Sequence, residues 1–233
     1  MITLSVDTSG PVCSVAVLKD GAILGEQMAL NHMTHSANLM PMIDRVLEDT
    51  GLNLQLIERI ACVTGPGSFT GVRIGVSTVK GIAHGNDIPC VPVDALEAMA
   101  AGVGDFDGIV CPIQDARAGQ VYGAAFLPGC PPERLMDDCP IALEDYLHQI
   151  LQYGKRFLFL GDGMPVHKTA IARILGSAAV FAQPHMAYLR PGAVAVLGSI
   201  SDVTLNYKEL MPMYLRAPSA ERNRKLVEAA KNV

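Results

Sequence analysis

The chain has 233 residues and a formal net charge of −5, with 50% hydrophobic and 18% charged residues. A chain of this length can form one large domain or two lobes, each with a sizeable buried core. The negative charge disfavours direct RNA binding, which requires a positive field to neutralise phosphates. The low charged fraction favours apolar surface covered by a partner protein, with a merely well-filled core as the other explanation.

The cysteines and the first residues indicate the compartment. Six cysteines occur without a CxxC or zinc-ribbon spacing, so we expect small core residues in a reducing environment. No run of about eighteen apolar residues appears. The chain starts directly with strand-like residues 2–6, without a basic segment or cleavage site. We therefore expect a cytoplasmic protein that is neither exported nor membrane-spanning.

The first half of the chain predicts an antiparallel meander of three strands followed by βα units. Tight breakers separate the strands, and apolar residues recur at three- and four-residue spacing in the first helix. The expected strands are 2–6, 13–18, 23–30, 60–63 and 90–93, and the expected helices are 36–49, 70–84 and one opening at Asp94.

The second half begins again with paired strands and continues with helices. The expected elements are strands 108–113, 121–126 and 156–160 and helices 143–151, 166–175 and 191–200. Two lobes with this order indicate an α/β protein with a duplicated ribonuclease-H-like architecture of the actin-like ATPase type, the second copy being incomplete. We expect an N-terminal lobe at 1–104, a C-terminal lobe at 105–216 and a tail at 217–233.

A glycine-rich turn at residues 64–73 is the sharpest local feature. Free amides at the N-terminus of the following helix would attract anions. The alternative, which we favour, is that Ser68 or Thr70 caps the helix while the glycines permit close packing. It is not a Walker A loop, because no Gly-Lys-Ser/Thr follows it.

Small residues at four-residue spacing continue along this helix as Gly71 and Gly75, then Ser77, Gly81 and Gly85. Each glycine costs a helix roughly 0.8–1 kcal/mol, so several in one helix need a packing reason such as a closely crossing second helix. That neighbour is internal or belongs to a partner. The candidate docking surface, on this helix and helix 36–49, comprises His35, Leu39, Met42, Ile43, Val46, Arg73, Ile74, Ser77, Lys80 and Gly81.

Turn residues at the ends of strands form a candidate nucleotide site. The candidates are Asp7, Thr8, Ser9, Asp115, Gly161, Asp162 and Gly163. They stand where actin-like ATPases hold metal, phosphate and adenosine, but such residues are also ordinary in turns, which is the reading we favour. His32 and His35 lack a third ligand nearby, and no catalytic triad or GxSxG elbow occurs.

Three stretches of the sequence resemble the signatures of the bacterial TsaB family, also called YeaZ. They are residues 64–75, 115–122 and 212–222, and the likeness extends from the first strand to the tail. The middle stretch departs from the pattern, because Ala118 and Gln120 replace a second basic residue and an acid. The role of this hairpin therefore stays open.

The resemblance implies a partner subunit that works with TsaD and TsaE to make threonylcarbamoyladenosine next to the anticodon of tRNAs reading codons that begin with A. TsaD transfers the threonylcarbamoyl group, using a metal held by two histidines four residues apart. Ala95 and Met99 occupy those positions here, and neither suits that metal. We therefore expect no catalytic residue, no metal and no cofactor in this chain, and the older peptidase interpretation fails on the same residues.

Two functions compete. The leading hypothesis is an interaction protein that pairs with TsaD through a helical bundle, forms a homodimer when alone and meets tRNA only through the complex. The alternative is an actin-like ATPase or small-molecule kinase that uses Asp7, Asp115 and the Gly161 loop around magnesium and ATP. Stoichiometry and any nucleotide at the subunit interface stay open.

Overall fold

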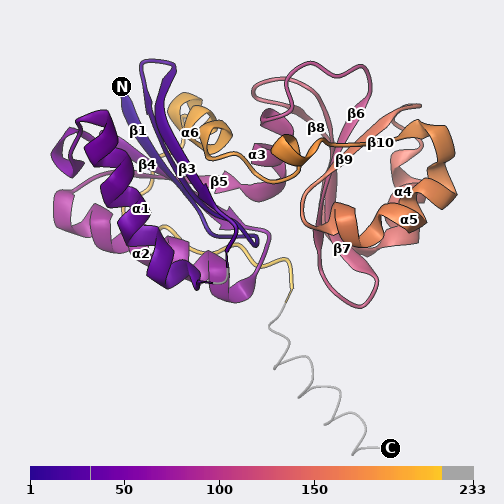
Figure 1. The fold of residues 1–233 in the computed structure, drawn as a ribbon, viewed down its shortest axis with the longest axis horizontal. Helices are drawn as coiled ribbons and strands as arrows, with labels where there is room; N and C mark the ends of the chain where they lie inside the picture. Colours follow the sequence, from indigo (N-terminus) through magenta and orange to yellow (C-terminus); the bar gives the residue numbers. More distant parts are fainter. Residues whose placement is uncertain (32, 217–233) are drawn as a thin grey trace, which may run out of the picture.

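The computed structural model describes residues 1–31 and 33–216, and in these residues the strands form two five-stranded sheets (Figure 1). The first sheet has the order β3-β2-β1-β4-β5. Its strands are β1 (Ile2–Asp7), β2 (Cys13–Lys19), β3 (Ala22–Ala29), β4 (Arg59–Gly65) and β5 (Cys90–Asp94). β1 to β3 form the expected antiparallel meander, and β4 and β5 run parallel to β1. Asp20 and Gly21 make the tight β2–β3 turn with positive φ angles of 50° and 86°.

The second sheet repeats the first, with the order β10-β9-β6-β7-β8. Its strands are β6 (Ile109–Asp115), β7 (Gln120–Leu127), β8 (Glu133–Ala142), β9 (Phe157–Leu160) and β10 (Ala179–Phe181). In the reverse direction this order is β8-β7-β6-β9-β10, so each strand corresponds in turn to β3, β2, β1, β4 and β5 of the first sheet. The second copy therefore has all five strands, which corrects the expectation that it is incomplete.

The sequence analysis missed β8 and β10 for different reasons. β8 contains Asp137, Asp138 and Pro140, which interrupt the apolar alternation, yet it pairs along β7 with register shifts. β10 has only three residues and pairs in parallel with β9. Neighbouring strands, not local pattern, define both elements.

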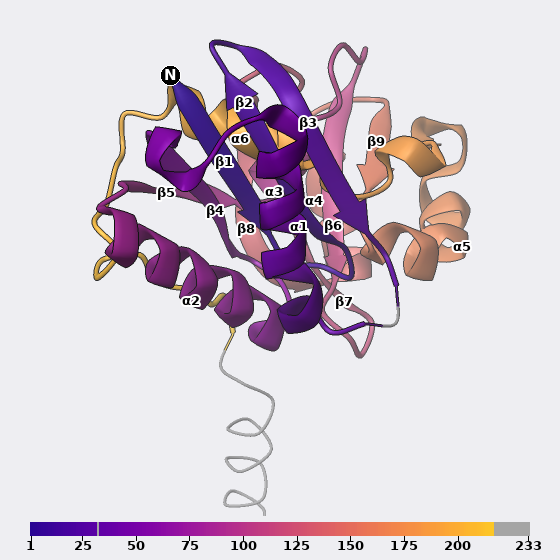
Figure 2. The same ribbon diagram turned by 60° about the vertical axis from the view of Figure 1, so that its left-hand side comes forward.

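The helices lie in three layers around the two sheets (Figures 1 and 2). They are α1 (His35–Thr50), α2 (Phe69–Asn86), α3 (Ala95–Ala101), α4 (Leu143–Ile150), α5 (Gly163–Leu175) and α6 (Pro191–Ile200), with short 3-10 turns at Leu54–Leu56, Gly176–Ala178 and Pro184–Met186. α1 and α2 cover the outer face of the first sheet, and α4 and α5 cover that of the second. α3 and α6 lie between the sheets.

The two central helices exchange sheets. α3 follows the first sheet but packs on β6 and β7 of the second, whereas α6 follows the second sheet and packs on β1, β2 and β4 of the first. Ser5 Oγ on β1 donates a hydrogen bond to Pro191 O at 2.8 Å. Each lobe is therefore completed by a helix from the other half of the chain.

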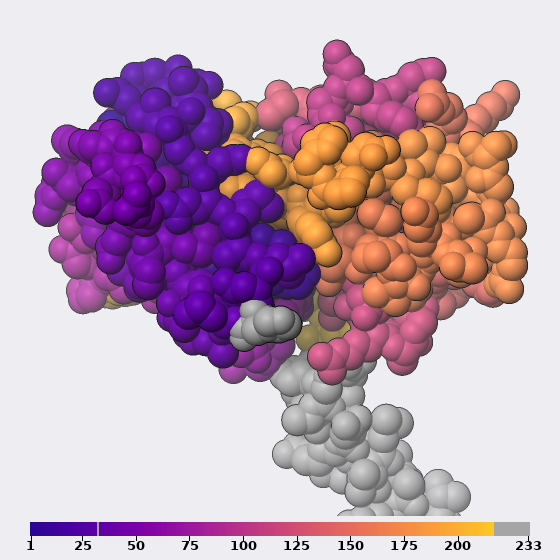
Figure 3. All heavy atoms as spheres, in the orientation of Figure 1, coloured from indigo at the N-terminus to yellow at the C-terminus, as the bar shows by residue number. Residues whose placement is uncertain are grey.

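The segment after α6 also returns to the first lobe, although it falls in the range 105–216 expected for the second. Leu205 pairs with Cys90, Leu210 is fully buried in the first core, and Met213 N donates to Thr64 O at 2.7 Å. In Figure 3 the light-orange atoms that cross between the lobes belong to the part of the chain around α6, which leads into this segment. Residues 217–233, expected as a tail, lie outside the described residues.

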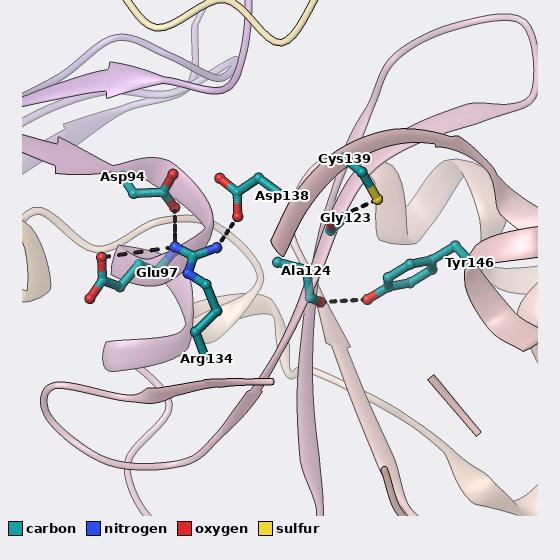
Figure 4. Close-up of polar contacts among 8 residues, drawn as sticks. All are labelled: Asp94, Glu97, Gly123, Ala124, Arg134, Asp138, Cys139 and Tyr146. Carbon is teal, nitrogen blue, oxygen red and sulfur yellow. Dashed lines mark hydrogen bonds and ion pairs between the residues drawn. The ribbon is translucent and has the colours of Figure 1, made fainter. Parts of the chain in front are cut away.

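An ionic cluster joins the lobes beside α3 (Figure 4). Arg134 on β8 pairs with Asp138 on the same strand and reaches Asp94 at 3.4 Å and Glu97 at 4.0 Å. Asp94 also caps α3, because its Oδ1 accepts a hydrogen bond from Glu97 N at 2.7 Å. Burial and the hydrogen bond to Asp138 raise the pKa of Asp94 to about 8.

Together the sheets and helices form a duplicated ribonuclease-H-like fold of the actin-like ATPase type. The order βββαβαβα occurs twice, with mixed sheets and matching strand orders. The first strand of each sheet, β1 or β6, ends near the contact between α3 and α6. Side chains at and after these two strand ends are therefore brought together.

Candidate functional site

The expected docking surface on α1 and α2 is partly internal. Leu39, Met42, Ile43 and Val46 on α1 are buried in the core of the first lobe, against β2, β3 and α2. They are thus unavailable to a partner in this conformation, which corrects their assignment as surface residues. The sequence shows an apolar stripe but not what covers it, and the chain's own sheet does so.

The remaining expected interface residues lie at or near the surface of α2 and the start of α1. Arg73, Ser77 and Gly81 are exposed, and Ile74 and Lys80 are half-buried. Lys80 Nζ donates to Lys208 O and Leu210 O at 3.3 and 3.1 Å. These bonds anchor the segment after α6, so Lys80 has an internal role besides any contact with a partner.

Arg73 and His35 also have partners within the chain. Arg73 Nε donates to Tyr214 Oη at 2.7 Å, and its guanidinium lies 3.9 Å from the centroid of the Phe69 ring. His35 Nε2 is 2.9 Å from Gly10 O. Within residues 1–31 and 33–216, Ser77 and Gly81 are therefore the exposed α2 residues of the predicted set that have no side-chain hydrogen bond or close packing contact.

The α2 glycines have two different environments. A Cβ at Gly75 would lie 2.5 Å from Thr8 Oγ1, and one at Gly71 would overlap Thr8 O, so close packing against the end of β1 requires both glycines. A Cβ at Gly81 or Gly85 would meet no atom of the described residues within 4 Å. Internal packing thus explains the first pair but leaves the second pair unexplained.

The glycine-rich turn before α2 packs against its own chain. A Cβ at Gly65, where φ is 131°, would lie 2.5 Å from Met213 O, and one at Gly67 would overlap Ser9 O. Ser68 Oγ accepts a hydrogen bond from Gly71 N at 3.2 Å. The capping interpretation is therefore confirmed for Ser68, and the close backbone approach is made by the protein itself.

A cleft of about 530 Å³ opens between the lobes and is the main cavity next to this turn. Its walls come from the loop after β1, the turn before α2, the β6–β7 hairpin, the start of α5 and the last described segment. The lining includes Ser9, Gly10, Pro11, His35, Pro66, Gly67, Ser68, Phe69, Thr70, Gln114, Asp115, Ala116, Arg117, Tyr122, Asp162, Met213, Tyr214, Leu215 and Arg216.

Three of the candidate nucleotide residues, Ser9, Asp115 and Asp162, meet in this cleft from both lobes. Asp7 lies behind them, lining a smaller recess with Ser9, Asp162 and Met99. The other candidates do not line the cleft and have packing roles.

Those packing roles are specific. Thr8 Oγ1 donates to Gly71 O at 2.7 Å. A Cβ at Gly161, where φ is 95°, would overlap Ile113 O, and one at Gly163 would lie 3.1 Å from the Gln114 backbone. The glycines after β9 thus bring the start of α5 against β6 and place Asp162 in the cleft.

The acids differ in their electrostatic setting. Asp7 is fully buried, and burial raises its pKa, although Ser9 N donates to its Oδ1 at 2.8 Å. Burial raises the pKa of Asp162 to about 6. Asp115 Oδ1 accepts from Arg117 N at 3.0 Å and lies 3.6 Å from His167 Nε2.

Sequence reasoning missed Gln114 and Tyr122 as lining residues. Gln114 is next to Asp115 and only 2% exposed, and neither of its amide atoms has a hydrogen-bond partner among the described residues. The signal was present, because a polar amide ends the apolar run of β6, but a single glutamine does not distinguish a site from a strand end.

Ala95 and Met99, which we expect at the positions of the TsaD histidines, are packed in the core between the sheets. A Cβ at Gly161 would lie 3.2 Å from Met99 Sδ, so the thioether fills space beneath the cleft. Within residues 1–31 and 33–216, no cluster of three potential His, Cys, Asp or Glu ligands occurs. Among the same residues, no helix combines the length and apolarity needed to cross a membrane.

Comparisons with known proteins agree over nearly the whole chain. The family model of TsaD, tRNA N6-adenosine threonylcarbamoyltransferase, matches residues 29–223. The tRNA threonylcarbamoyladenosine biosynthesis protein TsaB of Bacillus subtilis is 34% identical over 95% of this chain and 96% of its own length. The Haemophilus influenzae TsaB protein is 40% identical over 51% of each chain.

Solved structures show the same fold. A Pseudomonas aeruginosa protein described as similar to the peptidase YeaZ superposes with a TM-score of 0.78 at 24% identity, covering 92% of this chain and 99% of the other. YeaZ from Pseudomonas aeruginosa gives a TM-score of 0.76 at 22% identity, with the same coverage. The sequence match to the Bacillus subtilis protein, the family model and this fold place the chain in the TsaB (YeaZ) family.

Proposed function

We propose that this chain acts in threonylcarbamoyladenosine biosynthesis on tRNA as a non-catalytic partner subunit of TsaD, in an assembly that also includes TsaE. The names of the relatives support the pathway, and membership of the family that the TsaD model describes supports pairing with a related chain. The buried Ala95 and Met99 support the non-catalytic assignment, because neither side chain is a suitable ligand for a catalytic metal.

The observation that carries the partner role is the exposed strip on α2 formed by Ser77, Gly81 and Gly85. Gly81 and Gly85 lie in the helix with open space beside them, and Ser77 is exposed on the same face. Glycine destabilises a helix, and small residues let another helix approach closely. The strip therefore fits a helix of TsaD, and the same strip on a second copy supports a homodimer when TsaD is absent.

The interface is tested by placing a large charged side chain on the strip. Ser77→Arg should weaken TsaD binding by at least about tenfold in a pull-down or calorimetric titration, because a buried unpaired guanidinium would oppose helix contact. Thr169→Arg is the matched control. Thr169 is also exposed on a helix, but that helix, α5, lies on the second sheet and not on the first. Equal TsaD binding by the two variants would refute the interface.

The non-catalytic role has a separate test. Threonylcarbamoyl transfer should occur in a mixture of this chain, TsaD and TsaE and should not occur with this chain alone. Transfer by the isolated chain would contradict the assignment based on Ala95 and Met99. The alternative of an ATPase or kinase is tested by calorimetry with magnesium and ATP, where micromolar binding by the isolated chain would favour it.

A further inference from the structure

The last described segment, residues 205–216, lies along α2 before it reaches the second lobe, and we call it the strap. Its yellow trace runs beside α2 in Figure 2. Three contacts follow one another along the helix: the His84 and Tyr207 rings have centroids 4.3 Å apart, Lys80 Nζ donates to Leu210 O at 3.1 Å, and Arg73 Nε donates to Tyr214 Oη at 2.7 Å. The strap therefore runs antiparallel to α2, and three α2 side chains hold it there.

The far end of the strap reaches the β6–β7 hairpin of the second lobe. Met213 N donates to Thr64 O at 2.7 Å, so the strap is fixed to the first lobe up to this point. Arg216 then donates a hydrogen bond to Gln120 Oε1 at the start of β7, and its guanidinium lies 5.9 Å from the centroid of the Tyr122 ring. The strap thus joins α2 in one lobe to the hairpin in the other.

The turn of this hairpin has an unfavourable backbone. Arg117 and Ala118 have positive φ angles of 64° and 51°, in the left-handed region that a Cβ makes unfavourable. Such a backbone persists where neighbouring groups hold it. Ala116 N donates to Gln120 O at 3.0 Å and closes the turn. Arg216 binds the side chain of this same Gln120, so the strap acts where the strained turn is closed.

The strap also lies beside the α2 strip that we assign to the partner. Gly81 directly follows Lys80 in the helix, and Gly85 directly follows His84. Met211 on the strap is 63% exposed, and its Sδ lies 3.8 Å from Lys80 Nζ. A helix seated on the strip would therefore border the strap and limit its movement.

We propose that the strap couples α2 to the β6–β7 hairpin, with Arg216 as the hook that holds the turn. A partner helix on the α2 strip confines the strap, and the strap passes this restraint to Gln120. The coupling rests on the proposed function, because it needs a partner on α2. The hold of Arg216 on the hairpin needs no partner and is tested in the free chain.

Hydrogen exchange of the hairpin amides in the free chain tests the hook. In Arg216→Ala, the amides of Ala116 and Gln120 should exchange at least about threefold faster than in the native chain, because the turn loses a hydrogen bond that supports it. Unchanged exchange in this variant would overturn the hook.

A second variant should strengthen the same contact. Gln120→Glu should slow exchange of the Ala116 amide at least about threefold, because a carboxylate accepts a stronger hydrogen bond from a guanidinium than an amide does. The slowing should disappear when Arg216→Ala is added. Equal slowing with and without Arg216 would place the effect in the turn itself and overturn the hook.

The matched control for the loss of an arginine is Arg173→Ala. Arg173 on α5 lies 3.5 Å from Glu144 Oε1, and among the described residues it has no hydrogen bond or ion pair with the hairpin. Hairpin exchange should stay native in this variant. An increase equal to that in Arg216→Ala would overturn the assignment to the hook.

The coupling is tested by the same measurement with TsaD bound. TsaD should slow exchange of the Ala116 and Gln120 amides at least about threefold in the native chain and should not slow it in Arg216→Ala. No slowing in the native complex, or equal slowing in both complexes, would overturn the coupling while the partner role stands. Absence of TsaD binding to the native chain would refute the proposed function and the coupling together, and the free-chain result on Arg216 would be unaffected.

Discussion

At the scale of single residues, the glycines of α2 show how similar sequence features have different physical causes. Gly75 lies against Thr8 Oγ1, whereas Gly81 faces open space. Each has another glycine four residues away, Gly71 or Gly85, so the sequence does not distinguish them. The difference depends on what lies opposite each position, which local spacing does not encode.

Alanine at these two positions should have opposite effects on stability. Gly75→Ala should lower the free energy of unfolding by roughly 1–3 kcal/mol, because the added Cβ overlaps the Thr8 hydroxyl. Gly81→Ala should raise it by up to about 1 kcal/mol, because alanine is the better helix former and meets no neighbour. Urea unfolding measures both, and equal shifts would contradict the two environments.

At the scale of elements, α1 has the expected amphipathic pattern but a different role for its apolar face. Leu39 packs into the first core, and its neighbour Met40 is 40% exposed. Gly51 then ends the helix in the left-handed conformation, with φ 68°. The periodicity predicts the helix well. It does not show what covers the apolar face, which β2 and β3 of the same chain contact in place of the expected partner.

A pair of substitutions on α1 separates the two faces. Leu39→Glu should destabilise the chain by about 4 kcal/mol or more, because it buries an unpaired charge in the core. Met40→Glu should change the free energy of unfolding by less than about 0.5 kcal/mol. Circular dichroism during urea unfolding provides the measurement. A native midpoint for Leu39→Glu would show that this face is not core.

At the scale of the whole molecule, the lobes are joined by the exchange of α3 and α6 and by the ionic cluster around Arg134. Asp94, Glu97 and Asp138 all face this single guanidinium. One guanidinium carries a single positive charge, which three ionised carboxylates would exceed. This excess of negative charge agrees with the raised pKa of Asp94, which is also buried.

This cluster makes stability depend on pH in a defined direction. The pKa of Asp94 is about 8 in the folded chain and near its ordinary value of 3.8 when unfolded, so the folded state holds the proton more tightly. Its contribution to stability is full below about pH 4 and is lost as the pH rises through about 8. Ionisation of Asp94 thus opposes folding at alkaline pH.

Asp94→Asn tests that dependence, because asparagine still caps α3 but does not titrate. Urea unfolding at pH 5 and pH 8.5 should show a larger loss of stability in the native chain than in Asp94→Asn. Asp137→Asn, at an exposed position on β8, should retain the native dependence. Identical pH slopes for the native chain and Asp94→Asn would contradict the role of Asp94.

The sequence alone determined the family and most helices and strands, because signature stretches and apolar periodicity are local properties. It also identified Ser9, Asp115 and Asp162 as candidates, since each lies at or just after the end of a strand. Only the tertiary structure decided that these residues share one cleft, that Gln114 lies unpaired at its wall, and that Leu39 is internal. The reason is that burial and partnership depend on segments far apart in the chain, which meet through sheet pairing and the crossing of α3 and α6.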